Sequence, residues 1–292
     1  GKIASEPIDI ALAPIWSVPL PRRMAEDLLP PDEFRAAEDR DGLLSYHPII
    51  AGNKVLLLTG DQIGDVNAYD LHTGQSLWPP DSPSPDEPAE ETESRVGLGR
   101  VFPSTYVGVP RFTMTAYNRM LFVKLGLQAT SFPLLDRQLP PEPGYLTALD
   151  LTAQKKRLFE IHLEPPMWEV GWNLEGAPVS DGRNLYTVMR RRDNLRAQSH
   201  VACFDMKRGR LQWRTFVAAA DTLGQGRSLE YTHNLLTLDD EMLYLNTNLG
   251  AVAALHTTDG RIAWLTRYPR APVGDDPPYR SLRHVYRDVT PC

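Results

Sequence analysis

A short motif that recurs along the chain constrains its fold more than any other feature of the sequence. An alternating apolar stretch leads into an aspartate or histidine, a glycine follows four positions later, and a tryptophan follows eight positions after the aspartate or histidine. Full copies span residues 66–78, 201–213 and 252–264, and a degenerate copy begins at residue 146 without the glycine and the tryptophan. The alternation is typical of a half-buried strand. Asp-x-x-x-Gly is typical of a tight turn, because the carboxylate accepts backbone N–H groups and glycine tolerates a positive φ. Each copy therefore predicts a β-hairpin whose second strand carries the tryptophan.

A weaker repeat of apolar strand, polar turn and apolar strand precedes each hairpin. Its strand starts align at Pro48, Met114, Pro178 and Leu236, at intervals of 66, 64 and 58 residues, and Pro291 begins a fifth copy. Each full repeat then contains four strands, and tandem four-stranded units predict a β-propeller. The 26 prolines among 292 residues agree with an all-β chain, because proline interrupts helices.

We therefore predict an all-β fold, a β-propeller of four-stranded, W-shaped blades that forms a single segment over residues 1–292. The predicted repeats cover residues 45–80, 106–164, 174–217 and 230–268, with partial blade strands at 14–20 and 286–292. About four blades with partial flanking strands make an incomplete ring. We expect either a segment of a longer propeller or a ring completed by another chain, because open blade edges favour association.

Two charged stretches interrupt the pattern. The insert at residues 79–95 is acidic and rich in proline, which predicts a solvated loop. Arg190, Arg191 and Arg192, together with Arg196, predict a solvated basic loop between two strands. Neither stretch indicates a separate domain.

The repeated motif resembles the blade motif of PQQ-like propellers, a family that includes quinoprotein alcohol dehydrogenases and outer-membrane assembly lipoproteins. Asp70, Thr73, Gly74 and Trp78 match it best. The resemblance implies a ring of about seven or eight blades, with the repeated tryptophan packed between neighbouring blades. It implies structural roles for the motif residues Asp70, Gly74, Trp78, Asp150, Asp205, Gly209, Trp213, Gly260 and Trp264.

One polar residue lies three positions before each aligned strand start. These residues are Ser45, Arg111, Glu175, His233 and Asp288. Since the inner strands of a propeller begin at one face, we expect the five side chains at one mouth of the axial channel. Such a ring suits an anionic or polyol ligand, or a calcium ion bound by Glu175 and Asp288. The alternative is that strand starts are polar simply because they are solvated.

Two further candidates near this ring are Trp172 and Asn173, in the run of residues 168–173. A tryptophan at a channel mouth could stack on a planar ring or a sugar. In the quinoprotein dehydrogenases that the motif resembles, PQQ lies between a tryptophan and a vicinal disulfide, beside a Ca²⁺ ion. The two cysteines of this sequence, Cys203 and Cys292, are not adjacent.

The sequence lacks the motifs of several other classes of function. The sequence has no phosphate-binding loop, dinucleotide fingerprint, Gly-x-Ser-x-Gly elbow or His-Glu-x-x-His motif. The net charge of −6 provides no basic field that would attract nucleic acid. No apolar run reaches the roughly 18 residues of a transmembrane helix.

The leading prediction is a non-catalytic binding or protein-interaction scaffold that needs no cofactor. Its partner would be a protein, the remaining blades of the propeller, or a small polar ligand, and the resemblance implies a periplasmic, cell-surface or secreted location. A PQQ- and Ca²⁺-dependent quinoprotein dehydrogenase, an oxidoreductase of alcohols or sugars, is the second hypothesis, and a carbohydrate-binding propeller is the third. The scaffold predicts tolerance of Glu175→Ala, the dehydrogenase predicts Ca²⁺-dependent PQQ binding that this change abolishes, and the carbohydrate-binding protein predicts loss of binding on Trp172→Ala.

Overall fold

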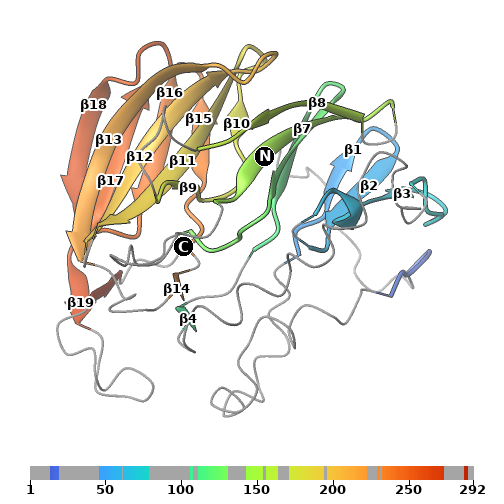
Figure 1. Cartoon of the computed structure of the whole chain (residues 1–292), viewed down its shortest axis with the longest axis horizontal. Helices are drawn as coiled ribbons and strands as arrows, with labels where there is room; N and C mark the ends of the chain where they lie inside the picture. Colours follow the sequence, from blue (N-terminus) through green and yellow to red (C-terminus); the bar gives the residue numbers. More distant parts are fainter. Residues whose placement is uncertain are drawn as a thin grey trace.

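Four antiparallel sheets follow one another along the chain and lie side by side as the blades of a β-propeller (Figure 1). The structure is a computed structural model that describes residues 14–19, 46–60, 62–78, 106–107, 111–130, 143–153, 156–163, 171–193, 196–221, 229–230, 232–272 and 286–288. Within these residues the only helical element is a short 3-10 helix, Ile63–Asp65. The predicted all-β propeller fold is confirmed.

The blades are built in chain order, each strand pairing with the next. The first contains β1 (Ile49–Ala51), β2 (Lys54–Leu58) and β3 (Val66–Asp70), and the second contains β5 (Met114–Tyr117), β6 (Met120–Leu125), β7 (Tyr145–Asp150) and β8 (Lys156–Ile161). The third contains β10 (Val179–Ser180), β11 (Asn184–Asp193), β12 (Arg196–Asp205) and β13 (Leu211–Asp221), with β9 (Asn173–Leu174) also paired to β11. The fourth contains β15 (Leu236–Asp239), β16 (Met242–Thr247), β17 (Ala251–His256) and β18 (Ile262–Arg267).

Two small sheets lie outside the blades. The strand β4 (Tyr106–Val107) pairs in parallel with β14 (Leu229–Glu230), and β19 (Arg270–Pro272) pairs antiparallel with β20 (Tyr286–Asp288). Residues 14–19 form no strand, although a partial blade strand is predicted there. The acidic insert at 79–95 lies outside the described residues.

The first blade lacks a regular fourth strand among its described residues. A single bridge between Tyr69 and Ser76 stands where the other blades have their outermost strand. Pro79 and Pro80 follow soon after in the sequence. Because proline has no N–H to donate to a ladder, strand pairing is not expected to continue through them.

The blades are held together by apolar layers between neighbouring sheets, and the strand β6 shows how one strand serves two layers. Leu121 and Val123 belong to the layer shared with the first blade, whereas Phe122 belongs to the layer shared with the third. Successive side chains of a strand point to opposite faces, so a strand covered on both faces is apolar throughout. A third layer, which includes Val201 and Leu243, joins the third and fourth blades.

The turns that begin with Asp70, Asp205 and His256 and close with glycine have one geometry in three blades. The N–H of the glycine donates to the carbonyl of the residue four positions earlier at 2.9 Å for Gly74, 2.8 Å for Gly209 and 2.9 Å for Gly260. The φ angles of these glycines are 69°, 65° and 70°, a region that side chains with a Cβ avoid. The carboxylate Oδ1 of Asp70 accepts the N–H groups of His72 at 3.0 Å and Thr73 at 2.9 Å.

A β-bulge fixes the outer aromatic side chain at the same place in three blades. The register of the two outermost strands shifts by one residue, so that Phe159, Trp213 and Trp264 each follow a residue without a direct cross-strand partner. A bulge redirects the side chains beyond it. Phe159 and Trp213 thereby pack against the turn glycines of the next blade, Gly209 and Gly260.

Candidate functional site

Three of the five polar residues that precede the strand starts lie close to one another. Thr232 and Asn234, the neighbours of His233, both donate hydrogen bonds to Glu175. The ring of His233 stacks on that of His47 from the first blade, with centroids 6.2 Å apart and planes 7° from parallel. Burial lowers the pKa values of both histidines, and the positive charge of Arg111 lowers them further. The structure therefore brings Arg111, Glu175 and His233 into one region.

The other two residues of the predicted ring are not placed in this region by the structure. Ser45 lies outside the described residues. Asp288 is described only by its backbone, which pairs with Arg270 between β20 and β19. The predicted calcium pair of Glu175 and Asp288 therefore remains a prediction.

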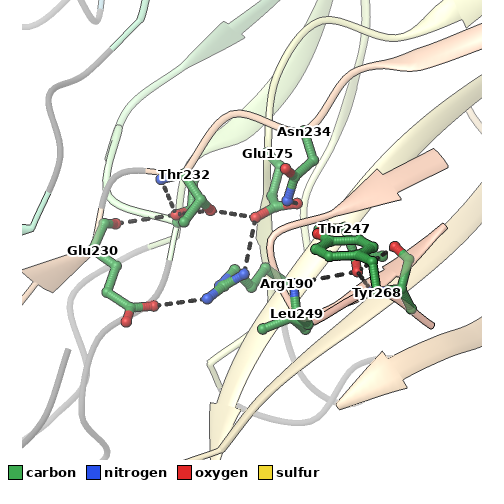
Figure 2. Close-up of polar contacts among 10 residues, drawn as sticks. Glu175, Arg190, Glu230, Thr232, Asn234, Thr247, Leu249 and Tyr268 are labelled. Atoms are coloured by element: carbon green, nitrogen blue, oxygen red, sulfur yellow. Dashed lines mark hydrogen bonds and ion pairs between the residues drawn. The ribbon is translucent and has the colours of Figure 1, made fainter. Parts of the chain in front are cut away.

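Glu175 is the centre of a buried polar network (Figure 2). Its side chain is fully buried, and Oε2 accepts a hydrogen bond from Asn234 Nδ2 at 2.7 Å. Oε1 accepts the hydroxyl of Thr232 and lies 3.6 Å from Nη1 of Arg190. A carboxylate removed from water needs such donors and a nearby cation to remain ionised.

Arg190 extends this network to a second buried carboxylate. Its Nη2 donates to Glu230 Oε2 at 3.0 Å, and both side chains are almost completely buried. Glu230 lies in β14, just before the fourth blade, whereas Arg190 lies in β11 of the third. One guanidinium therefore joins a carboxylate of the third blade to a carboxylate of β14.

The second blade reaches the same network through Thr130. Its backbone N–H and its hydroxyl both donate to the carbonyl of Glu230, at 2.7 and 3.0 Å, and its Oγ1 accepts the N–H of Thr232 at 2.9 Å. We call the residues of this network the polar junction. They are Thr130, Glu175, Arg190, Glu230, Thr232 and Asn234. The junction joins the second, third and fourth blades at the end where their inner strands begin.

The geometry of the junction does not fit the predicted calcium ligands. Both oxygens of Glu175 already accept hydrogen bonds, and the guanidinium of Arg190 beside Oε1 would repel a cation. Asn173 Oδ1 accepts the N–H of Gly144 at 3.2 Å. Among the described residues no group of three or more histidine, cysteine, aspartate or glutamate side chains is arranged to hold a metal ion. The buried network also alters the expectation that Glu175 tolerates replacement, because its loss leaves Arg190 without one of its anions.

Trp172 is buried in the core, in contrast to its predicted role at the channel mouth. The side chain is 1% exposed and belongs to the apolar layer between the second and third blades. Its ring meets the edge of His200 at 4.5 Å between centroids, and the guanidinium of Arg214 lies 5.2 Å from its centre. A ring covered in this way cannot stack on a ligand, so the predicted stacking role of Trp172 is wrong. Trp168 lies outside the described residues.

A buried lysine and a partly buried histidine lie beside the junction. Burial lowers the pKa of Lys124 to about 7, and the negative charge of Glu175 only partly opposes this shift. Lys124 Nζ donates to the carbonyl of Gln128 at 3.1 Å. Burial, followed by the charges of Arg111, His47 and Lys124, lowers the pKa of His233 to about 4. Both groups therefore favour their neutral forms in the folded protein more than they do in water.

The arginine run at 190–192 is structural, and its interpretation as a solvated loop is wrong. Arg190 and Arg192 are 2% and 1% exposed in β11, which extends through Asp193. The strand β12 pairs with β11 along its whole length, through Asp193, and β9 also pairs with Arg190 on the inner side of the third blade. Alternation along the strand turns Arg190 and Arg192 to the same face. A run of positive charge by itself suggests a loop. The feature that indicates a buried strand is the two-residue spacing of Arg190 and Arg192, together with the acidic residues that are buried with them.

Cys203 shows no feature of a reactive thiol. It lies buried in β12, and burial raises the pKa of its thiol to about 12. A thiolate is needed for redox chemistry or metal binding, so this cysteine packs as a small apolar residue. Across the described part of the chain, no helix is both long and apolar enough to span a membrane.

The comparisons with known proteins agree with the repeat pattern. Residues 164–276 match the family model described as outer membrane protein assembly factor BamB. No curated protein matches the chain. Among solved structures, BamB from Moraxella catarrhalis is 15% identical, with a TM-score of 0.41, over 74% of this chain and 50% of that chain.

Two quinohemoprotein alcohol dehydrogenases are also similar in structure. The enzyme ADHIIG from Pseudomonas putida HK5 is 11% identical, with a TM-score of 0.47, over 75% of this chain and 33% of that chain. The enzyme from Comamonas testosteroni is 12% identical, with a TM-score of 0.47, over 75% of this chain and 34% of that chain. The matched region thus spans between a third and a half of the length of these proteins. The family match covers the third and fourth blades, which carry two of the three full copies of the motif, so these two blades are similar to the repeats that this family model describes.

Proposed function

We propose that this protein is a non-catalytic protein-interaction scaffold that binds its partner along the outer strands of its blades. The observation that carries the proposal is where its exposed apolar side chains lie. Five large apolar residues of the outermost strands β8, β13 and β18 are exposed: Leu158, Leu211, Phe216, Trp264 and Leu265. Exposed apolar side chains that recur on the outermost strands of three blades can serve as anchors for a protein partner.

The backbone of these strands supports the same proposal. Each of β8, β13 and β18 ends the strand order of its sheet within the described residues. An outermost strand presents N–H and C=O groups to which an extended segment of another protein can pair. In β13, which runs from Leu211 to Asp221, Phe216 is 51% exposed beside this edge. Such a strand offers both hydrogen bonds and an apolar anchor.

The contacts at the centre of the molecule favour a scaffold over a cofactor-dependent enzyme. The Glu175 carboxylate is engaged by Thr232, Asn234 and Arg190, and Trp172 is covered by protein. These residues, which the dehydrogenase and carbohydrate hypotheses would use, instead hold blades together. The similarity to a family described as an outer membrane protein assembly factor favours a protein partner and a periplasmic or cell-surface location.

The proposal is tested by photo-crosslinking from the outer strands. A photoreactive phenylalanine analogue replaces Phe216, and in a matched control it replaces Thr237, an exposed residue of the inner strand β15. Crosslinking in the cells that produce the protein should give a defined adduct from position 216 and none from position 237. The partner identified from that adduct is then purified, and Phe216→Asp should weaken its binding at least tenfold, or about 1.4 kcal/mol. Equal adducts from both positions, or unchanged affinity of Phe216→Asp, would contradict the proposal.

A titration separates the scaffold from the dehydrogenase. PQQ is added with and without Ca²⁺, and tryptophan fluorescence reports binding. The scaffold predicts no saturable binding, whereas Ca²⁺-dependent binding at micromolar or tighter affinity would support the dehydrogenase.

A further inference from the structure

We propose that His47, Arg111 and His233 form a binding site for a phosphate group at the end of the molecule where the inner strands begin. The three residues lie two or three positions before the first strands of the first, second and fourth blades. The inference goes beyond the proposed function and does not depend on it, because the site is formed at the inner strands and the proposed partner binds the outer ones.

The backbone turns His47 and Arg111 to the same side of two neighbouring segments. Tyr46 and Phe112 form a parallel bridge, and their rings stack with centroids 5.9 Å apart. Both rings belong to the apolar layer between the first and second blades. Successive side chains of an extended segment point to opposite sides, so His47 and Arg111 point away from this layer. Both residues are exposed.

The fourth blade adds His233, whose position is fixed by contacts on several sides. The residues before and after it donate hydrogen bonds to Glu175 (Figure 2). Its ring lies so close to Gly176 that a Cβ on this glycine would come within 3.0 Å of the ring atom Cε1. The ring of His47 stacks on it from the first blade, with planes 7° from parallel. A side chain held in this way loses little freedom when it binds a ligand.

The charges around His233 favour an anion. The two buried acids of the polar junction are both paired with Arg190. Within the described part of the chain, neither acid forms an ion pair with Arg111 or with Lys124. The positive charges of these two side chains both act on His233. A bound anion would offset the repulsion among these groups.

His233 also has a nitrogen that is free to bind a ligand. Its Nε2 atom is buried and has no hydrogen-bond partner among the described residues. A buried polar atom without a partner is uncommon in proteins and indicates a site for a ligand or a water molecule. The guanidinium of Arg111 adds a planar fork of N–H donors that matches phosphate oxygens.

The directions of these donors suit phosphate better than a carboxylate. The side chains approach from three different blades. The oxygens of phosphate point to the corners of a tetrahedron, whereas the two oxygens of a carboxylate lie in one plane with their substituents. A tetrahedral anion can therefore accept hydrogen bonds from an arginine and two histidines that do not share a plane.

Binding should be coupled to protonation of His233. Burial and then the neighbouring positive charges lower the pKa of His233 to about 4. The charged and titratable groups packed around it are His47, Arg111, Lys124, Glu175, Arg190 and Glu230. A bound dianion favours the imidazolium and so raises this pKa. Binding then takes up protons, and the affinity should rise as the pH falls.

NMR of the chain with isotopically labelled histidine tests the inference, with inorganic phosphate as the probe at constant ionic strength. The ring resonances of His47 and His233 should shift saturably, with a dissociation constant of about 1 mM or lower. His72 and His256, which lie in blade turns, are internal controls and should not shift. Equal shifts of all four histidines, or no saturable shift of His47 and His233, would overturn the proposal. Acetate at the same concentration should have no effect, and equal binding of acetate would overturn the assignment to phosphate.

A pair of arginine substitutions identifies the site. Arg111→Gln should raise the dissociation constant for phosphate about tenfold or more, because it removes the guanidinium. Arg119→Gln is the matched control, since Arg119 is an exposed arginine of the same blade, in the turn between β5 and β6. This variant should bind phosphate as the unaltered chain does, and equal affinities of the two variants would overturn the proposal.

Sulfate tests the coupling to protonation, because it remains a dianion in mildly acidic solution, where phosphate gains a proton. Its affinity should rise as the pH is lowered from neutral towards the pKa of His233, and the rise should be lost in His233→Gln. A sulfate affinity that does not depend on pH would overturn the role of His233. Arg111→Gln should leave the partner crosslink from position 216 intact, so that failure of this inference and failure of the scaffold proposal are distinguished.

Discussion

The polar junction and the blade turns use carboxylates in the same way at very different depths. Glu175 accepts hydrogen bonds from Thr232 and Asn234 in the interior, whereas Asp70 accepts them from His72 and Thr73 at the surface. Water competes for the donors at the turn but not at the junction. Removing a buried partner leaves an uncompensated charge, which costs far more than the loss of an exposed hydrogen bond. The comparison indicates that burial, and not the number of hydrogen bonds, determines how much each carboxylate contributes to stability.

Replacement of Glu175 should have the largest effect. Glu175→Ala leaves Arg190 beside one carboxylate instead of two, and breaking a buried pair costs about 3–5 kcal/mol. Urea unfolding followed by tryptophan fluorescence measures the loss. Glu160→Ala is the matched control, because this carboxylate also contacts two basic groups, Arg157 and His162, but in a partly exposed position. Equal losses for the two variants would show that the junction is no more important than a surface ion pair.

Acid should weaken the junction through His233. Its pKa is about 4 in the folded protein against an ordinary value of 6.5, so the unfolded chain binds more protons between these values. Stability should therefore fall as the pH drops from about 6.5 to about 4, by about 3 kcal/mol in all. The urea midpoint measured across this range checks the slope. His233→Gln cannot take up this proton, and a slope unchanged by that substitution would assign the acid sensitivity to other groups.

Replacement of Lys124 should increase the stability of the protein, in contrast to replacement of Glu175. Burial lowers its pKa to about 7 from 10.5, so at pH 7 folding must either bury its charge or release its proton. Lys124→Met keeps an unbranched apolar side chain one atom shorter than lysine and removes the charge, and should stabilise the protein by roughly 2 kcal/mol at pH 7. The gain should shrink as the pH rises from 7 towards 10.5, because the unfolded lysine also loses its proton there. Thermal unfolding at pH 7 and pH 10 makes the comparison, and a gain that does not depend on pH would indicate better packing alone.

A second contrast, between contacts that are local in the sequence and contacts that are distant, explains which features could be predicted from the sequence. The turns at Asp70 and Gly74 depend on residues within one motif, so their geometry follows from the sequence directly. The strands follow from alternation, and the blades follow from the spacing of the repeats. Because the blades repeat, polar strand starts such as Glu175 and His233 could be predicted to lie near one another. The groups that they contact could not be predicted.

The junction could not be predicted because its partners are far apart in the sequence. Arg190 meets Glu230 across 40 residues, and Glu175 meets Asn234 across 59. Three consecutive arginines are typical of a solvated loop, and the pairing of β11 with β12 and β9 shows that the strand continues through them. The direction of Trp172 could not be predicted for a similar reason, since a tryptophan near a polar strand start can face the core as readily as the channel. Side-chain direction near the end of a strand depends on the neighbouring sheet, which the local pattern does not contain.

A substitution in a blade turn should have the smallest effect on stability. It is the exposed counterpart of a substitution in the buried junction. Asp70 is exposed, and the hydrogen bonds from Thr73 and His72 hold the pKa of its carboxyl below the ordinary value. Asp70→Ala should therefore lower the melting temperature slightly, and this loss should disappear in acid, where the carboxylate of the unaltered protein is protonated. His256→Ala is the matched control, because His256 occupies the same turn position in the fourth blade and none of its side-chain atoms caps the turn. If Asp70→Ala cost as much as Glu175→Ala, exposure would not weaken the carboxylate, and the contrast between the turns and the junction would fail.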